Sequence, residues 1–91
     1  MRIRWTPAAA EDLQHIRDYL KQHYPHFTQS TLLRLYETAR SLKVSPYRGR
    51  IGREEGTREL VCVPLPYIIA YRVKSETVEI LHIHHGAQDR S

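Results

Sequence analysis

The sequence has a single cysteine, no long apolar run and no internal repeat. The one thiol, Cys62, cannot form a disulfide within the chain, so we expect folding in a reducing compartment. No apolar segment approaches the ~20 residues of a membrane span, and the N-terminal residues read as a strand rather than a signal peptide. We therefore expect a cytoplasmic protein without a membrane segment.

The 91 residues are enough for one domain, 1–91, with a modest core. The formal charge is +4, and all of the excess lies in residues 40–72, which hold seven bases and three acids. Eleven of the fourteen bases are arginine, the residue suited to bidentate recognition of phosphate or carboxylate. Two interpretations stay open: an ordinary solvated basic surface, or an anionic partner such as nucleic acid or an acidic polypeptide.

Two helices are expected in the first half of the chain. Thr6 and Pro7 are typical of a helix start, with Thr6 as the N-cap, and a Tyr-Pro pair should end this helix near His23. We expect Glu11 and Asp12 to interact favourably with its dipole. A second helix should begin near residues 28–30. Because only about four residues join them, the two helices should form an antiparallel hairpin.

Four strands are expected around this hairpin. Residues 2–5 alternate basic and apolar side chains, which predicts an edge strand or a parallel addition to the later strands. The runs 57–63, 67–73 and 78–85 are separated by short connections and predict an antiparallel meander. Residues 47–56, with three glycines and three arginines, are interpreted as a flexible connector. The order β-α-α-β-β-β predicts an α+β fold of two layers, a helical hairpin packed on a small, mainly antiparallel sheet.

Alternation along the predicted strands assigns side chains to the two faces of the sheet. In the middle run Tyr71 and Arg72 point in opposite directions. In the last run His82 and His84 are expected to share a face with Ile80. Because the helices should cover one face, we expect the function on the other face and its rim.

Several motifs occur together along the chain. They are Trp5-Thr6-Pro7-Ala8, Pro46-Tyr47-Arg48-Gly49-Arg50, Gly56-Thr57-Arg58-Glu59-Leu60-Val61, Tyr67-Ile68-Ile69-Ala70-Tyr71-Arg72-Val73 and Val78-Glu79-Ile80-Leu81-His82-Ile83-His84-His85. In this order they resemble the RelE/ParE superfamily of bacterial toxins. The resemblance implies a type II toxin that needs no cofactor and is neutralised by a cognate antitoxin in a hetero-oligomer. RelE-like members cut messenger RNA on the ribosome, whereas ParE-like members poison DNA gyrase.

Two positions favour the ParE-like kind. RNA-cutting members typically carry a base directly after the Tyr that opens the middle strand, where this chain has Ile68. They also tend to have a basic residue and a Tyr after the last strand, where this chain offers only Arg90. We therefore favour a ParE-like toxin that acts by binding a macromolecule such as gyrase. The alternatives are a RelE-like, ribosome-dependent mRNA endoribonuclease and a non-toxic, partner-binding remnant.

If the chain is a ribonuclease, its catalytic candidates lie on the predicted sheet. Metal-free RNA cleavage needs a base, an acid and cations. His82, His84 and His85 could supply the base and the acid, while Arg58 and Arg72 could supply the charge if their strand faces coincide. Alternatively, the histidines are packed or hydrogen-bonded, and both arginines pair with carboxylates on neighbouring strands.

The candidate contacts to a target or to nucleic acid are all arginines. They are Arg48, Arg50 and Arg53 in the loop, with Arg58, Arg72 and Arg90. No metal site is expected, because the two-apart histidines of the last strand have no Cys pair or carboxylate nearby at ligand spacing. Cys62 is expected to be a buried structural thiol.

Overall fold

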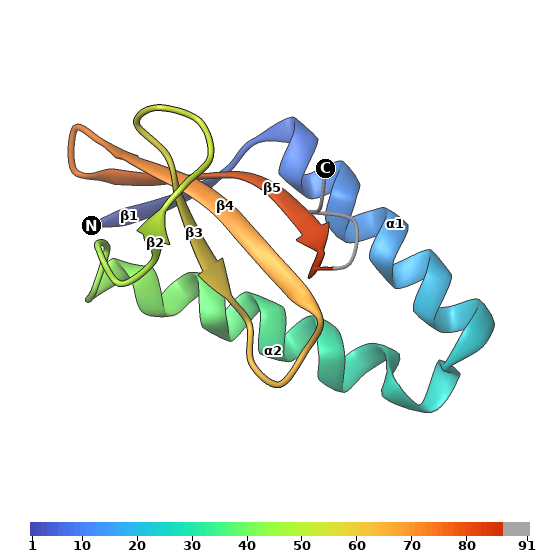
Figure 1. Ribbon diagram of the computed structural model, residues 1–91. Coiled ribbons are helices and arrows are strands. Elements are labelled where there is room, and N and C mark those ends of the chain that lie inside the picture. The colour runs from blue at the N-terminus through green and yellow to red at the C-terminus, as the bar shows by residue number, and fades with distance from the viewer. Residues whose placement is uncertain (87–91) are drawn as a thin grey trace.

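The computed structural model describes residues 1–86, which form one sheet and a helical hairpin (Figure 1). The helices are α1 (Pro7–His23) and α2 (Thr28–Arg40), with 3-10 turns η1 (Pro25–Phe27) and η2 (Ser41–Lys43). The strands are β1 (Arg2–Trp5), β2 (Arg50–Ile51), β3 (Arg58–Val61), β4 (Tyr67–Lys74) and β5 (Thr77–His85). None of the helices in the described residues is long and apolar enough to cross a lipid bilayer.

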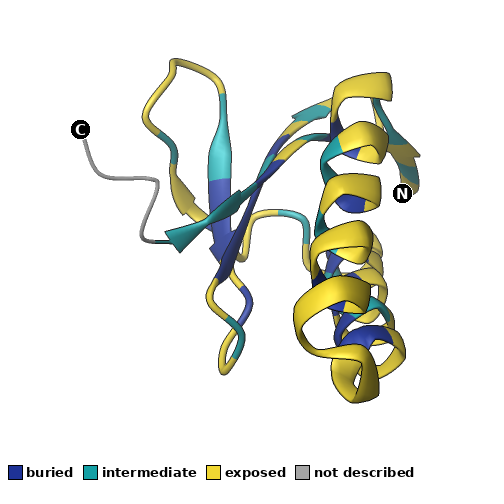
Figure 2. Ribbon diagram, turned by 90° about the vertical axis from the view of Figure 1, so that its right-hand side faces the viewer, coloured by how far each residue is buried: buried dark blue, intermediate teal, exposed yellow. Residues whose placement is uncertain are grey.

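The sheet has the strand order β1-β5-β4-β3-β2, with β1 parallel to β5 and every other pair antiparallel. Both helices lie on the same side of this sheet (Figure 2). The α+β prediction of two layers is therefore confirmed, and so is the expectation that residues 2–5 join as a parallel edge strand. The face turned away from the helices is called the open face below.

The first helix begins as its sequence predicts. The hydroxyl of Thr6 accepts a hydrogen bond from the backbone N–H of Ala9 (3.2 Å), and Pro7 occupies the first helical position, where an N–H is not needed. The expected dipole role of Glu11 and Asp12 is wrong, because both residues lie beyond the first turn. Asp12 contacts β5 instead.

The core lies between the hairpin and the sheet. Its largest fully buried side chains are Tyr71, Leu35, Leu42, Ile69, Ile80, Val78 and Cys62. Each buried aliphatic side chain contributes about 1.5–3 kcal/mol through removal of apolar surface from water. Burial also raises the pKa of the Cys62 thiol to about 11, so this group is a structural thiol, as expected.

The loop before β3 is more ordered than a flexible connector. The buried hydroxyl of Tyr71 donates to the carbonyl of Pro46 (2.7 Å) and accepts from the N–H of Gly49 (2.9 Å). A Cβ at Gly49 would lie 2.8 Å from that hydroxyl, so this close approach requires glycine. Residues Arg50–Ile51 then pair with β3 as the short strand β2, which gives the sheet five strands rather than the four expected.

An irregularity in β5 changes which side chains share a face. Ile80 pairs with Tyr71 and His82 pairs with Ala70, so Leu81 is an extra residue between adjacent pairs, a β-bulge. Ile80 therefore points into the core, whereas His82 lies on the opposite face and is exposed. The prediction that His82 and His84 share a face with Ile80 is wrong, because a bulge reverses the alternation on its far side.

Candidate functional site on the open face of the sheet

Cross-strand pairing arranges the open face in three rows. The first row, near the β4–β5 turn, joins Arg4, Glu79 and Arg72. The second row holds His82, Ala70, Glu59 and Arg50, and the third holds His84, Ile68 and Val61. No helix covers these rows (Figure 2).

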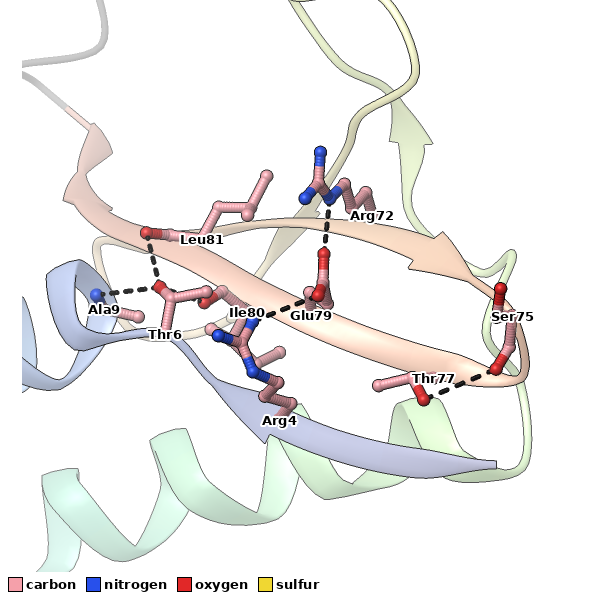
Figure 3. Close-up of polar contacts among 9 residues, drawn as sticks. All are labelled: Arg4, Thr6, Ala9, Arg72, Ser75, Thr77, Glu79, Ile80 and Leu81. Atoms are coloured by element: carbon pink, nitrogen blue, oxygen red, sulfur yellow. Dashed lines mark hydrogen bonds and ion pairs between the residues drawn. The ribbon is translucent and has the colours of Figure 1, made fainter.

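The first row is an ion cluster built from three strands. Glu79 of β5 accepts from Arg4 of β1 through one oxygen (3.0 Å) and from Arg72 of β4 through the other (2.5 Å) (Figure 3). The hydrogen bond from Arg72 is the main reason why the pKa of Glu79 lies below its ordinary value. Two guanidinium groups share one carboxylate, so the cluster keeps a net positive charge.

The second row contains a more buried ion pair. The carboxylate of Glu59 accepts from Arg50 (2.9 Å) and from the backbone N–H of Arg53 (3.4 Å). Burial alone would raise the pKa of Glu59, but the hydrogen bonds from Arg50 and Arg53 outweigh it and the pKa is lowered. Glu59 is thus held ionised, and it fixes the β2 edge to the rest of the sheet.

His82 is held in place by a carboxylate of the first helix. Asp12 Oδ2 lies 3.0 Å from His82 Nδ1 and also accepts from the backbone N–H of Ile83 (3.0 Å). The rings of His82 and His84 stack with their centroids 5.7 Å apart. Because Asp12 occupies Nδ1, the Nε2 side of His82 is the side available to a ligand or proton acceptor.

The proposed catalytic set is divided between the two faces. His82, His84 and Arg72 lie together on the open face, but Arg58 pairs with Tyr71 and so lies on the helix-facing side. Arg58 donates to the carbonyls of Gly49 (2.8 Å) and Tyr47 (3.2 Å) and stacks over the Tyr47 ring. The condition that the strand faces of Arg58 and Arg72 coincide is therefore not met.

The remaining predicted residues also point in different directions. His85 packs edge-on against Tyr67 on the helix-facing side (5.7 Å between centroids). Arg48 hydrogen-bonds the hydroxyl of Ser41 at the end of α2, whereas Arg50 turns to the open face. Arg48 and Arg50 of the loop therefore lie on different sides of the molecule. Arg90 lies outside the described residues.

Asp12 and Arg4 are the site residues that the sequence-based reasoning missed. Asp12 carries no local signal, since its partners are 70 and 71 positions away. Arg4 does carry a local signal, because its alternation with Ile3 and Trp5 assigns it to one face of a strand. Its contact with Glu79, however, depends on the parallel register of β1 on β5.

A groove of about 870 Å³ lies away from the open face, between α1 and the ends of β4 and β5. Its walls include Ile16, Leu20, Tyr67 and Ile83, together with Tyr19. Burial is the main cause that raises the pKa of the Tyr67 phenol.

No group of three or more His, Cys, Asp or Glu side chains within residues 1–86 is arranged to hold a metal ion.

The structure is a small two-layer domain with a charged sheet face that no helix covers. Residues 3–90 match the family described as the ParE toxin of the type II toxin–antitoxin system, parDE. The chain belongs to this family.

Its relatives carry both ParE and RelE names. Toxin RelE2 of Caulobacter vibrioides is 44% identical over 86 residues, which are 94% of this chain and 96% of that protein. Putative toxin Y4kP of Sinorhizobium fredii is 40% identical over 87 residues, 96% of this chain and 90% of that protein. The protein is thus a type II toxin of the ParE/RelE group.

Two solved structures share the fold. A chain of the chromosomal ParDE system from P. aeruginosa superposes with a TM-score of 0.85 at 27% identity, covering 93% of this chain and 95% of that one. A chain of the RelBE2 toxin–antitoxin complex from Mycobacterium tuberculosis has a TM-score of 0.65 at 29% identity, covering 92% and 95%. The prediction of a RelE/ParE-like fold is confirmed.

Proposed function

We propose that the protein arrests growth by binding a macromolecular target, with DNA gyrase as the candidate, and that a cognate antitoxin neutralises it in the cytoplasm. The observation that carries this proposal is the division of the catalytic candidates. Arg58 is held by loop carbonyls on the helix-facing side, away from His82 and His84. The negative charge of the phosphorane formed during RNA cleavage would then be stabilised, among these candidates, by Arg72 alone. The guanidinium of Arg72 already pairs with Glu79.

The open face suits binding rather than bond cleavage. Its guanidinium groups are fixed by carboxylates in two rows, which orients their outer N–H donors at little entropic cost on binding. The third row adds the exposed apolar side chain of Val61, beside Ile68, which is buried. Oriented charge with an exposed apolar side chain nearby is compatible with a protein-recognition surface.

One observation favours the ribonuclease alternative. The carboxylate of Asp12 orients His82 as a carboxylate orients the histidine of a general base, and His84 stacks beside it as a second titratable ring. RNA cleavage would need proton transfer by these imidazoles, whereas binding to gyrase would not. Substitution of both histidines therefore distinguishes the two functions.

The test uses the whole chain and a variant in which both histidines become glutamine, His82→Gln with His84→Gln. We expect the wild-type chain to inhibit supercoiling by purified gyrase and to leave ribosome-bound transcripts intact. An excess of an unrelated protein should not change its inhibition of gyrase. The glutamine variant should keep its gyrase inhibition within about threefold, because binding needs no proton transfer.

Two results would overturn the proposal. Ribosome-dependent transcript cleavage that falls by about 100-fold or more in the glutamine variant would establish acid–base chemistry. Absence of growth arrest on expression, with circular dichroism showing a folded chain, would indicate the non-toxic remnant. Lys21→Glu, an exposed change on α1, is the control for a general effect of altered surface charge.

A further inference from the structure

The two histidines of the open face lie at a spacing that suits chelation of one ion. His82 and His84 are two residues apart beyond the bulge, so both side chains leave β5 on the same face. Their ring centroids are 5.7 Å apart. Two imidazoles that share one tetrahedral ion, through nitrogens about 2.1 Å from it, would have centroids about 5.2 Å apart. The observed separation is therefore within about 0.5 Å of the separation that one ion requires.

A carboxylate of the first helix orients one of the two rings. The sequence offers this histidine pair no carboxylate at ligand spacing, but the fold brings Asp12 of α1 to within 3.0 Å of His82 Nδ1. A histidine that binds a metal commonly gives its other ring nitrogen to a carboxylate, which fixes the tautomer and makes the coordinating nitrogen more basic. Asp12 also accepts from the backbone N–H of Ile83, so its own position is fixed. Nε2 of His82 is thus prepared as a donor on a side chain that is 52% exposed.

The surroundings of the pair admit a cation. On β4, the residue opposite His82 is Ala70 and the residue opposite His84 is Ile68, and neither carries a charge. The guanidinium groups of the adjacent row share the carboxylate of Glu79, which reduces their repulsion of an ion. No helix covers this part of the sheet (Figure 2). An ion can therefore reach both imidazoles from the solvent.

We propose that His82 and His84 bind one divalent transition-metal ion of the Zn²⁺ type, through Nε2 of His82 and a ring nitrogen of His84, with Asp12 as a positioning residue. Imidazole ligands favour Zn²⁺, Ni²⁺ and Cu²⁺ over Mg²⁺ and Ca²⁺, which take oxygen ligands. Within residues 1–86 no third His, Cys, Asp or Glu completes the site, so the remaining coordination positions are left to water or to a donor from a partner. This inference concerns the ligand of the histidine pair and does not depend on gyrase being the target.

The binding is tested by calorimetric titration of the untagged whole chain with Zn²⁺. We expect saturable binding of one ion per chain. Mg²⁺ under the same conditions should give no saturable binding, because two imidazoles are poor ligands for it. In NMR spectra the ring nitrogens of His82 and His84 should shift when Zn²⁺ is added. Those of His85, which packs on Tyr67 on the helix-facing side, should not.

Substitution of single histidines locates the site. His82→Gln and His84→Gln should each weaken Zn²⁺ binding by about tenfold or more, because only one imidazole of the pair then remains. The matched control is His26→Gln, at an exposed histidine of η1, which should leave binding within about twofold of the wild-type value. Circular dichroism checks that each variant is folded.

Asp12→Asn tests the positioning role separately from the fold. The amide oxygen can still accept from the N–H of Ile83, but the negative charge beside His82 is lost. Zn²⁺ binding should weaken by about tenfold. In the metal-free variant the ring nitrogens of His82 should report a mixture of tautomers in place of one, a change that a merely structural role of Asp12 would not produce. Asp18→Asn is the exposed control on the same helix and should alter neither measurement.

Three outcomes would overturn the inference. The first is the absence of saturable binding below millimolar Zn²⁺. The second is Zn²⁺ binding that the combined His82→Gln and His84→Gln variant leaves unaltered, which would assign the ion to other histidines. The third is binding of Mg²⁺ as tight as that of Zn²⁺, which would indicate an attraction of charge without coordination by imidazole. Zn²⁺ binding is measured on the isolated chain, without gyrase or ribosomes, so either proposal can fail alone.

Discussion

The two halves of β5 are held in place by different means. From Thr77 to Ile80 the strand pairs on both sides, with β1 and with β4. Beyond the bulge at Leu81, β1 has ended, and side chains of the first helix segment replace it: Thr6 binds the carbonyls at the bulge, and Asp12 binds the N–H of Ile83. The first half is thus held by backbone ladders on both sides, whereas the second half has the β4 ladder on one side and two side chains on the other.

This difference determines where the histidines lie. Without the extra residue, the alternation of an unbroken strand would place Ile80, His82 and His84 on one face. The bulge lets Ile80 stay in the core while both histidines reach the open face, where Asp12 fixes His82. Weakening either side-chain contact should therefore disturb the second half of β5 and leave the first half intact.

Thr6→Val should have the largest effect. The Thr6 hydroxyl donates to the carbonyl of Ile80 (2.7 Å) and accepts from the N–H of Ala9, so one group serves both the bulge and the helix cap. Its loss should lower the free energy of unfolding by about 2 kcal/mol and the melting temperature by roughly 10 °C. Thermal and urea denaturation followed by circular dichroism measure both.

Two further variants test the cause. Thr6→Ser keeps the hydroxyl and should restore most of the lost stability. Thr38→Val removes a hydroxyl that bonds only within α2 and should change the free energy of unfolding by less than about 0.5 kcal/mol. Equal losses in Thr6→Val and Thr38→Val would mean that the bulge is not anchored by this hydroxyl.

Asp12→Ala should have a smaller and more local effect. The partly buried N–H of Ile83 would lose its acceptor, at a cost of about 1 kcal/mol. Hydrogen exchange of the Ile83 amide should accelerate, whereas the amide of Val78 in the first half should keep its protection. Asp12→Asn retains a side-chain oxygen and should restore part of the protection, and Asp18→Ala is the exposed control on the same helix. Equal acceleration in both halves of β5 would contradict the division described above.

Much of the fold follows from local patterns in the sequence. The Thr6-Pro7 start, the Tyr-Pro stop after His23 and the strand alternation around Tyr71 each depend on neighbouring residues only, and all three are confirmed. The alternative that both strand arginines pair with carboxylates on neighbouring strands holds for Arg72, which binds Glu79, but not for Arg58, which donates to loop carbonyls.

The features that escaped prediction depend on contacts between distant segments. The bulge at Leu81 is stabilised by Thr6, 75 positions earlier, and the two residues of β2 are too few to carry a periodic signal. The sequence left open whether Arg58 and Arg72 share a face, and the pairing of Arg58 with Tyr71 places them on opposite faces. The carbonyl partners of Arg58 come from the loop, whose path is set by the Tyr71 hydroxyl. The faces of His82, His84 and Arg58 were therefore not predictable from alternation alone, because a bulge and the strand register decide them.

The smallest effect is expected in the first half of β5, at Glu79. The hydrogen bond from Arg72 lowers the pKa of Glu79 in the folded chain. A lowered folded pKa means that the cluster's contribution to stability is present above the ordinary value of 4.5 and is lost as the pH falls through the folded pKa. In Arg72→Ala the pKa of Glu79, followed by NMR titration of its carboxyl carbon, should therefore rise, because the hydrogen bond that lowers it most is lost.

Arg17→Ala is the matched control for this titration, since Arg17 is an exposed arginine whose nearest carboxylate is Asp18. It should leave the pKa of Glu79 unchanged. If Arg72→Ala also left it unchanged, the Arg72 contact would be unimportant in solution. Neither change should alter exchange at Ile83, because the ladder with β1 and β4 holds the first half of β5 without the ion cluster, and Asp12 holds the second half independently of it.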